Sequence, residues 1–451
     1  MNRPLNEQEL NYVFEHLELV MSIAAIRTEL SYGDKEKSDI SFSASDKDLS
    51  IKEVDGIPLL FASDENIIYS ITKEGRLIFH HDFLKSAFYL LSGYDEAFVN
   101  QGRDPWGRVK YECTIQHRLD IMHRPLVNEY FELIFNGVNE YLAIHKKPLL
   151  VKRKLFDSFG FLLSHDIDVI DKYGWPHLGF KIKELIGLVR SEHSFLKLLK
   201  ATIVSAFQFL NPRRSNPYWN FDALMKLEKK HQINASYYFL SFDMKGGSRY
   251  RFQEKRLVNL FAQLSDANHE IGIHGTTSTV KDAKRLKEEI THLEHASEAK
   301  VVGGRQHRLW LDETKTFKNH VEAGLKYDSS FGFAEHEGFR NSFCLPFKPY
   351  DFDKQKAIDC WQFPLMAKDV TLFSYRKLSP EQIKSSIQTI IAEVEKHNGI
   401  FTLLWHNSFF DETLYPGVKQ TYEDLLQLMH DHRATGITGK ELVSKLEENR
   451  P

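Results

Sequence analysis

Phe159-Gly160-Phe161-Leu162-Leu163-Ser164-His165-Asp166-Ile167-Asp168 is an apolar run that ends in two carboxylates. The run has the length and the flanks of a buried strand. Side chains alternate in direction along a strand, so Asp166 and Asp168 should point to the same side. Two like charges that converge at a strand end need a cation or a hydrogen-bond donor beside them. The pair therefore indicates a metal site or an acid/base centre, and the alternative is a strand end whose carboxylates are solvated.

Strand and helix patterns alternate from Phe156 onward, which is typical of a parallel β/α architecture. The predicted strands are Phe161–Ser164, Ala235–Leu240, Ile271–His274, Val301–Gly303 and Ile400–Trp405. The predicted helices between or after these strands are Phe221–His231, Lys281–Ala296, Thr316–Ala323, Pro380–His397 and Tyr422–His432. The sequence thus predicts an α/β fold in which helices connect parallel strands.

The first 150 residues predict a smaller α+β domain, whose role the sequence does not reveal. The polar break Lys146-Lys147-Pro148 is the predicted boundary, so the two domains are expected at 1–150 and 151–451. The helices predicted before the boundary are Glu7–Leu30, His81–Ser92 and Pro125–His145, and the strands are Ile40–Ser43, Ile57–Phe61 and Ile67–Ile71.

A helical insertion is expected at residues 178–215, after the first strand of the second domain. The part from Leu178 to Phe209 is apolar with interspersed basic residues, as in a helix that lies on a membrane surface. Burial against the N-terminal domain is the favoured alternative, because most apolar helix faces pack inside the protein. The basic residues are Lys181, Lys183, Arg190, Lys197 and Lys200.

Composition excludes several classes of protein. The hydrophobic content of 42% and the charged content of 27% are ordinary for a globular protein, and the net charge of -3 argues against a nucleic-acid partner. Three scattered cysteines cannot form a closed disulfide framework, which fits a reducing compartment. Neither a signal peptide nor an apolar run long enough to span a membrane is found, so a cytoplasmic location is expected.

Chemically useful side chains follow the predicted strands. His274 closes one strand, Arg305 and His307 follow the next, and His406 follows the last. The carboxyl ends of parallel strands meet at one edge of a β/α fold, where active sites are built. A single histidine there is usually a satisfied structural group. Together with the aspartate pair, however, four strand ends carry Asp, His, Arg/His and His, which predicts a functional constellation.

With these motifs the chain resembles the polysaccharide deacetylases of the NodB type, carbohydrate esterase family 4. The resemblance covers roughly Leu155 to Leu442, and Tyr89–Ile134 is similar to the poorly characterised N-terminal domain found in one branch of that family. It implies a distorted (β/α) barrel with fewer strands than the eight of the closed form. It also implies a divalent metal, zinc by preference, and hydrolysis of N- or O-acetyl groups on a carbohydrate.

The resemblance gives the aspartate pair two roles. Asp166 corresponds to the general base and Asp168 to a metal ligand. Ile167 separates carboxylates that are usually adjacent in the family, so the sequence leaves these two roles interchangeable. The family's second motif has two histidines four residues apart. Here His274 is present as a metal ligand, but the later position is Ser278, and serine is a poor ligand for zinc.

The remaining motifs complete the implied site. Arg305 matches the arginine that orients the base, and His307 stands two residues later, where the family has proline. We therefore take His307 as the third metal ligand, with His336 as a weaker candidate. Tyr327-Asp328-Ser329-Ser330 resembles the motif whose aspartate supports the site from behind. His406, in Leu404-Trp405-His406-Asn407, matches the histidine that protonates the leaving group.

Three functional hypotheses follow. The first is a metal-dependent deacetylase acting on an acylated carbohydrate or a glycan precursor, with Trp310 or Trp405 as a ring that could stack on the sugar or simply pack in the core. The second keeps the barrel but hydrolyses a C–N bond that is not part of a sugar. The third is an inactive glycan-binding pseudoenzyme, which Ser278 favours. Peripheral membrane contact is possible for any of them, and the oligomeric state is not readable.

Overall fold

The structure is a computed structural model that describes residues 1–34, 38–99, 102–172, 175–189, 191, 193–210, 216–244, 246–313, 315–412 and 414–449. The side chains of residues 175–177 and 208 are also outside the description. Residues 190, 192 and 211–215 of the predicted insertion, Arg190 among them, therefore lie outside the described residues.

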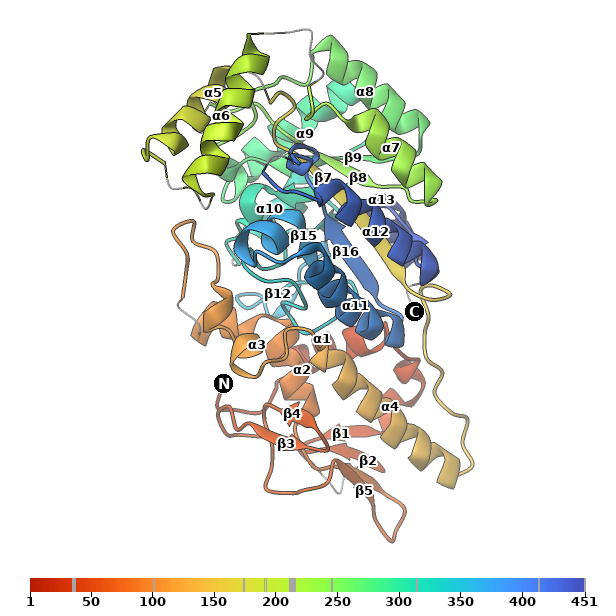
Figure 1. The fold of residues 1–451 in the computed structure, drawn as a ribbon. Helices are drawn as coiled ribbons and strands as arrows, with labels where there is room; N and C mark the ends of the chain where they lie inside the picture. The colour runs from red at the N-terminus through yellow and green to blue at the C-terminus, as the bar shows by residue number, and fades with distance from the viewer. Residues whose placement is uncertain are drawn as a thin grey trace.

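The first 150 residues form a small α+β region, at the bottom of Figure 1. A four-stranded sheet has the order β1-β2-β6-β5, and β3 pairs with β4 in an antiparallel hairpin. The strands are β1 (Leu30–Tyr32), β2 (Ile40–Phe42), β3 (Lys52–Val54), β4 (Ile57–Leu59), β5 (Tyr69–Ile71) and β6 (Leu77–Phe79). The helices are α1 (Glu7–Leu17), α2 (Phe83–Leu91), α3 (Ile115–Arg118) and α4 (Leu126–Ile144).

The first helix is shorter than the sequence predicted. It begins with a capping box between Asn6 and Glu9 and ends at Leu17, and a 3₁₀ helix follows at Ile23–Glu29. The segment between the two helices is held in another way, because Arg153 N donates to Val20 O at 2.8 Å. The carbonyl oxygen of Val20 is thus taken by the segment after residue 150 and not by a longer helix. The prediction of one helix over Glu7–Leu30 is wrong.

Residues from 160 onward build a parallel α/β sheet with the strand order β14-β11-β10-β9-β8-β7-β16-β15, and β17 pairs with the start of β7. The sheet curls back on itself, because its edge strands β14 and β15 are separated by only the four residues 363–366. The strands are β7 (Gly160–Ile167), β8 (Ser236–Leu240), β9 (Glu270–Gly275), β10 (Gly303–Gln306), β11 (Tyr327–Asp328), β14 (Trp361–Gln362), β15 (Ala367–Lys368), β16 (Ile400–Leu404) and β17 (Thr435–Gly436).

Helices cover this sheet, and a two-stranded hairpin of β12 (Tyr350–Asp351) and β13 (Lys356–Ala357) lies outside it. The helices are α5 (Trp175–Leu185), α6 (Phe195–Phe209), α7 (Phe221–Lys230), α8 (Lys255–Asp266), α9 (Ala283–Ser297), α10 (Thr316–Ala323), α11 (Pro380–Lys396), α12 (Val418–Asp431) and α13 (Gly439–Glu448). The predicted α/β class, with a distorted and incomplete (β/α) barrel and an additional N-terminal region, is confirmed.

The two regions share one hydrophobic core and buried polar contacts. The Arg340 guanidinium of the barrel pairs with Glu96 of the N-terminal region at 2.7 Å, and both side chains are buried. The division into domains 1–150 and 151–451 stays a proposal. The predicted insertion contains α5 and α6, which pack against each other at the end of the molecule away from the N-terminal sheet (Figure 1). Burial against the N-terminal domain, the alternative that we favoured, is therefore wrong, and many apolar side chains of the two helices are exposed.

Candidate active site

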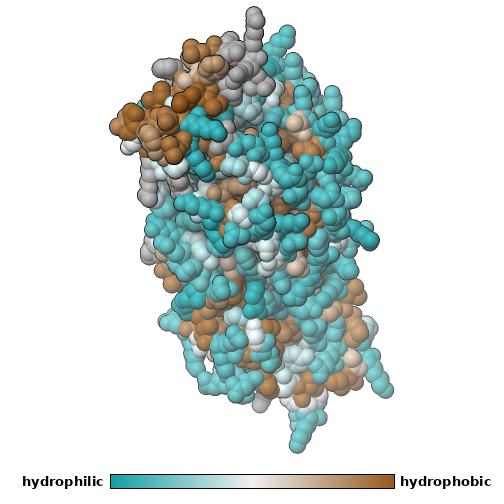
Figure 2. All heavy atoms as spheres, viewed as in Figure 1, coloured by the Kyte–Doolittle hydropathy of each residue, from teal (hydrophilic) through white to brown (hydrophobic). Residues whose placement is uncertain are grey.

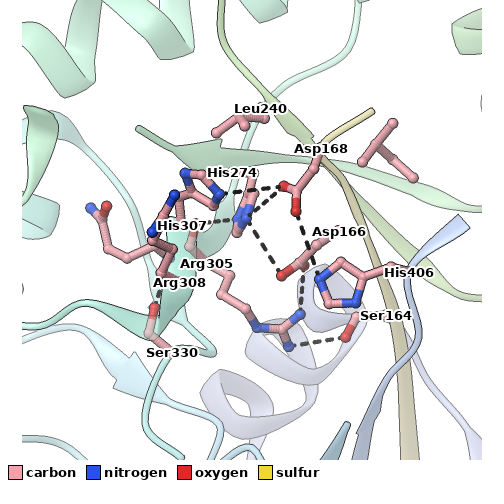
Figure 3. A network of polar contacts seen from close by, with 12 residues as sticks. Ser164, Asp166, Asp168, Leu240, His274, Arg305, His307, Arg308, Ser330 and His406 are labelled. Carbon is pink, nitrogen blue, oxygen red and sulfur yellow. Dashed lines mark hydrogen bonds and ion pairs between the residues drawn. The ribbon is translucent and has the colours of Figure 1, made fainter. Parts of the chain in front are cut away.

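The predicted site residues meet at the carboxyl edge of the barrel sheet (Figure 3). Asp166 is the last residue but one of β7 and Asp168 lies just beyond its end, while His406 follows β16. His274 in β9 lies directly opposite Arg305 in β10 in the parallel register. The expectation that both aspartates point to the same side is confirmed, because His274 Nε2 lies 3.6 Å from Asp166 Oδ2 and 3.3 Å from Asp168 Oδ1.

Asp168, His274 and His307 form a compact group of potential metal ligands, with one ligand atom from each lying within 4.8 Å of the others. Asp168 Oδ1 is 3.3 Å from His274 Nε2 and 4.0 Å from His307 Nε2. Tetrahedral zinc with bonds of about 2.0–2.1 Å places its ligand atoms roughly 3.3 Å apart. The three side chains are therefore spaced for a small cation that leaves a further position open.

The hydrogen-bonding state of these ligand atoms also fits a cation. Asp168 Oδ1 is buried, and no donor among the described residues reaches it in hydrogen-bonding geometry. His274 Nδ1 faces the Arg305 carbonyl oxygen at 2.9 Å, and His307 Nδ1 faces that of Gly246 at 3.1 Å. A ring nitrogen that donates to a carbonyl carries the proton, so each Nε2 keeps its lone pair for the space beside Asp168. This donor set matches a metal site.

Arg305 holds Asp166 in place. Its Nη1 donates to Asp166 Oδ1 at 2.7 Å, Nη2 donates to Ser164 Oγ at 2.9 Å, and Nε donates to the Ser329 carbonyl at 2.7 Å. Both charged side chains are almost completely buried. A buried charge that loses its partner is strongly destabilising, so the pair fixes the position of the carboxylate.

The motif that contains Asp328 supports this arginine and the neighbouring strand. Ser330 N and Oγ both donate to the Asp328 carboxylate, and Gln306 N donates to Ser330 Oγ at 2.8 Å. Asp328 thereby positions the backbone between Arg305 and His307 through one intervening serine.

The surroundings keep both aspartates ionised. Burial acts to raise the pKa of Asp166, but the Arg305 guanidinium outweighs it and holds the pKa below the ordinary value. Burial also opposes ionisation of Asp168, yet positive charge on the His307 and His274 rings, which a bound cation would supply in their place, lowers its pKa far below that of a free carboxyl. The site thus concentrates negative charge where the metal-ligand group lies.

His406 approaches the aspartates from the side opposite His307, with its Nε2 3.8 Å from Asp168 Oδ2 (Figure 3). Its Nδ1 lies 2.8 Å from Asp369 Oδ1, and its backbone N–H donates to Asp369 Oδ2 at 2.6 Å. Burial acts to lower the pKa of His406, but the completely buried Asp369 carboxylate raises it to about 9. The histidine is therefore oriented and protonated at neutral pH.

Two functional candidates at this edge were missed by the sequence analysis. Lys368 ends the short strand β15 and Asp369 follows it, and burial lowers the pKa of Lys368 to about 8. Their signal was present, because charged residues follow the apolar run Phe363-Pro364-Leu365-Met366. The two-residue strand was too short to recognise from its pattern.

The N-terminal region also contributes to the site. A cleft of about 200 Å³ is lined by Trp106 and Arg108 together with the aspartates and histidines. Arg108 Nη1 donates to the Arg308 carbonyl at 2.9 Å, and the Arg308 guanidinium lies 3.7 Å from the centre of the Trp106 ring. Trp106 is 47% exposed, so it stands at the mouth of the cleft. Arg108 is 58 positions from Asp166 and 200 from Arg308, and nothing in the local sequence connects these residues.

Several other candidates lie elsewhere. His336 belongs to a separate group with His123 and Glu337, where Arg376 already pairs with Glu337 at 3.2 Å. Ser278 is not among the metal-ligand group, and its Oγ donates to an Asp243 oxygen at 3.1 Å. Trp405 is fully buried among aromatic rings, so it packs in the core and does not face a sugar.

Comparison with known proteins identifies a family for the N-terminal part only. Residues 4–142 match DUF7033, described as a family of unknown function. This segment, less than a third of the chain, includes Trp106 and Arg108 of the cleft. No curated protein matches the sequence.

Solved structures resemble about two thirds of the chain at low sequence identity. A Mycobacterium smegmatis protein assigned as a polysaccharide deacetylase is 15% identical, with 65% of this chain and 93% of that chain covered and a TM-score of 0.43. The CE4 domain of a xylanase from the hindgut metagenome of Trinervitermes trinervoides is 9% identical, with 64% and 92% covered and a TM-score of 0.33. A Bacillus anthracis CE4 family pseudoenzyme is 10% identical, with 64% and 66% covered and a TM-score of 0.30.

Proposed function

We propose that the protein is a metal-dependent hydrolase that removes acetyl groups from an acylated carbohydrate. The observation that carries this proposal is the buried Asp168 Oδ1, which no donor of the described chain satisfies. It lies beside two histidines, His274 and His307, whose Nδ1 atoms face backbone carbonyls and whose Nε2 atoms are directed toward Asp168. Beside this group stand a carboxylate paired with Arg305 and a histidine paired with Asp369. A module that only binds glycan has no need of this base and acid.

Asp168, His274 and His307 would hold the ion. A carboxylate and two imidazoles suit zinc and several other first-row metals. When bound, such an ion polarises a carbonyl and lowers the pKa of a bound water to about 7. The hydrogen bonds from both Nδ1 atoms to backbone carbonyls present the imidazoles in the required orientation.

Asp166 is the proposed general base. Arg305 occupies its Oδ1, and its Oδ2 faces the metal-ligand group, 3.6 Å from His274 Nε2. An ionised carboxylate fixed beside the attacking water can accept the proton that the water loses. Arg305 therefore acts on position and charge state, through Asp166, and not directly on the substrate.

His406 is the proposed general acid. Asp369 holds its Nδ1, so Nε2 carries a proton toward the aspartates. A protonated imidazole on the far side of the scissile bond can give this proton to the departing amine or alkoxide. The division of base and acid between two sides matches the hydrolysis of an acetyl group.

The shape of the cleft favours a small acyl group on a larger ring. A volume of about 200 Å³ accommodates an acetyl group near the aspartates, and the half-exposed Trp106 ring stands at its mouth. Aromatic rings commonly pack against sugar faces because both surfaces are flat and partly apolar. Trp106 therefore replaces the buried Trp405 as a candidate ring and stands beside Trp310 as one.

Acetate release tests the proposal. The purified protein should liberate acetate from a panel of N- and O-acetylated sugars, exhaustive chelation should abolish the release, and added zinc should restore it. Release that survives complete removal of metal would contradict the metal mechanism. Hydrolysis of small cyclic amides without hydrolysis of acetylated sugars would contradict the carbohydrate substrate.

Replacing Asp369 with asparagine should lower kcat by about a hundredfold. The amide keeps only one acceptor oxygen for the two N–H groups of His406 that Asp369 accepts from, and it has no charge to stabilise the protonated ring. KM should change little, since Asp369 is buried and does not line the cleft. Steady-state kinetics separate the two parameters. A rise of KM with an unchanged kcat would contradict the assigned positioning role of Asp369.

A further inference from the structure

The hairpin of α5 and α6 exposes an unusual amount of apolar surface, seen as the brown area at the top of Figure 2. Of the 22 large apolar side chains that are exposed among the described residues, ten lie between 180 and 210. Their exposed fractions run from 39% to 79%. The most exposed are Ile186, Leu188, Phe195, Leu196 and Leu210. Soluble proteins rarely gather such residues in one place unless the surface binds something.

The hairpin also has a buried apolar side, so the exposed side chains are additional to those that fold it. Leu178 of α5 and Leu198 and Ala201 of α6 are buried, and the two helices pack against each other. The helices thus have one apolar side that is already covered and a second one that is not. Two apolar sides on a short helix are more than folding of this chain requires.

The hairpin is also basic, although the chain as a whole carries a net charge of -3. Lys183, Lys197 and Lys200 are exposed, and the sequence of α6 contains no acidic residue. The other lysine of α5, Lys181, is buried and paired with Glu184 at 2.8 Å. Exposed cations around exposed apolar side chains complement an anionic lipid surface.

These charges disfavour a second copy of the chain as the partner. A twofold dimer brings the same patch of both subunits together, so the lysines of α6 would face lysines. Like charges pressed together in an interface cost several kcal/mol. A bilayer with anionic headgroups satisfies the lysines and receives the apolar side chains.

The hairpin lies beside a route into the candidate active site. A cleft of about 630 Å³ is lined both by Asp168 and by Phe180 and Lys181 of α5. Arg249 and Arg308 also line it. When the hairpin holds the protein at a membrane, a substrate anchored in that membrane can therefore reach the metal-ligand group through this cleft.

We propose that the α5–α6 hairpin docks the protein on an anionic membrane, with its apolar side chains in the interface and Lys183, Lys197 and Lys200 against the headgroups. If the proposed deacetylase function holds, on which this last step rests, the acetylated sugar is carried by a membrane-anchored molecule. No helix of the described chain is long and apolar enough to cross a membrane, so this contact is made at the surface.

Sedimentation with vesicles tests the docking without any need for catalysis. The 451-residue protein should bind vesicles of phosphatidylcholine with about 30% phosphatidylglycerol, and should bind pure phosphatidylcholine vesicles much more weakly. The affinity for the anionic vesicles should fall as salt is raised. Absence of binding to both kinds of vesicle would overturn the proposal.

Two pairs of substitutions separate the apolar from the electrostatic part. Leu188→Asp with Leu196→Asp should weaken vesicle binding at least about tenfold, because both side chains are more than two-thirds exposed and should enter the interface. Lys197→Glu with Lys200→Glu should weaken it by about fivefold or more for each charge. Thermal melting checks that both variants stay folded, which their exposure predicts.

Matched controls are available on other helices. Val258→Asp with Val321→Asp places the same charges on the exposed parts of α8 and α10, and Lys287→Glu with Lys384→Glu repeats the charge reversal on α9 and α11. These variants should bind vesicles as the wild type does. Equal losses in hairpin and control variants would overturn the proposal, as would a dimer in solution that the hairpin substitutions dissociate.

The variant Asp166→Asn separates this proposal from the proposed enzymatic function. It should bind vesicles normally while it loses activity, because Asp166 lies in the barrel and not in the hairpin. A wild-type protein that binds vesicles but releases no acetate from any substrate would leave docking supported and the deacetylase function contradicted.

Discussion

Replacing Asp166 with asparagine is expected to lower kcat by about a thousandfold while the protein keeps its metal. The amide has the size of the carboxylate, so the packing around Arg305 changes little, but it cannot accept the proton of the attacking water. It also removes the negative partner of the buried Arg305 guanidinium, 2.7 Å away. The measurements are acetate release and metal content of the same preparation.

The matched control for this variant is Asp168→Asn, which should lose both activity and metal, because Asp168 belongs to the metal-ligand group. The two variants also decide the order of roles within the pair, which the sequence left interchangeable. Loss of metal in Asp166→Asn and its retention in Asp168→Asn would reverse the assignment. A kcat of Asp166→Asn close to that of the wild type would contradict the proposed base.

The largest effect on stability is expected from Glu228→Ala, with a fall of about 3–5 kcal/mol in the free energy of unfolding. Glu228 is fully buried between the barrel sheet and its helices, and its Oε1 lies 2.9 Å from His165 Nε2. Tyr237 Oη donates to it at 2.9 Å and Tyr422 Oη at 3.2 Å. Alanine would leave three buried polar groups without their acceptor.

Urea unfolding followed by circular dichroism measures this loss. Glu288→Ala, at an exposed position of α9, is the control and should change stability by less than about 0.5 kcal/mol. A loss below about 1 kcal/mol for Glu228→Ala would mean that the network around His165 does not hold the strand end.

The alternation of strand side chains explains why much of the site was predictable. His165 points away from the site toward Glu228, whereas Asp166 and Asp168 converge on His274. This division follows from strand geometry alone once the apolar run is recognised. The gap at Ser278 was also informative, since His307 from the neighbouring strand stands near the other ligands.

The glycines of β10 show where pattern reading failed. The prediction ended a strand at Gly303, but β10 begins there and runs to Gln306. Neighbouring groups approach so closely that a Cβ on Gly303 would lie 2.2 Å from the Tyr327 ring, and one on Gly304 would lie 1.9 Å from the Ile273 carbonyl oxygen. These glycines serve close packing within the sheet and do not end it.

Contacts between distant parts of the chain could not be predicted from one sequence. Trp106 and Arg108 reach the cleft from a region without any chemical motif. Asp369 acts on His406 from the next strand of the sheet, 37 positions away. Two helices of the barrel, α8 and α13, were missed for another reason, since their apolar residues do recur with helical spacing. Tertiary packing, and not local pattern, placed Trp106, Arg108 and Asp369.

The metal content of the purified protein tests the central claim most directly. Elemental analysis after reconstitution with zinc and removal of free ion should give about one zinc per chain for the wild type and for the control His336→Ala. His307→Ala should retain far less, because it removes one of the three proposed ligands. His307 is also the ligand that stands where the resembling family has proline. A wild-type protein without bound metal, or a His307→Ala variant that binds as much as the wild type, would contradict the proposed site.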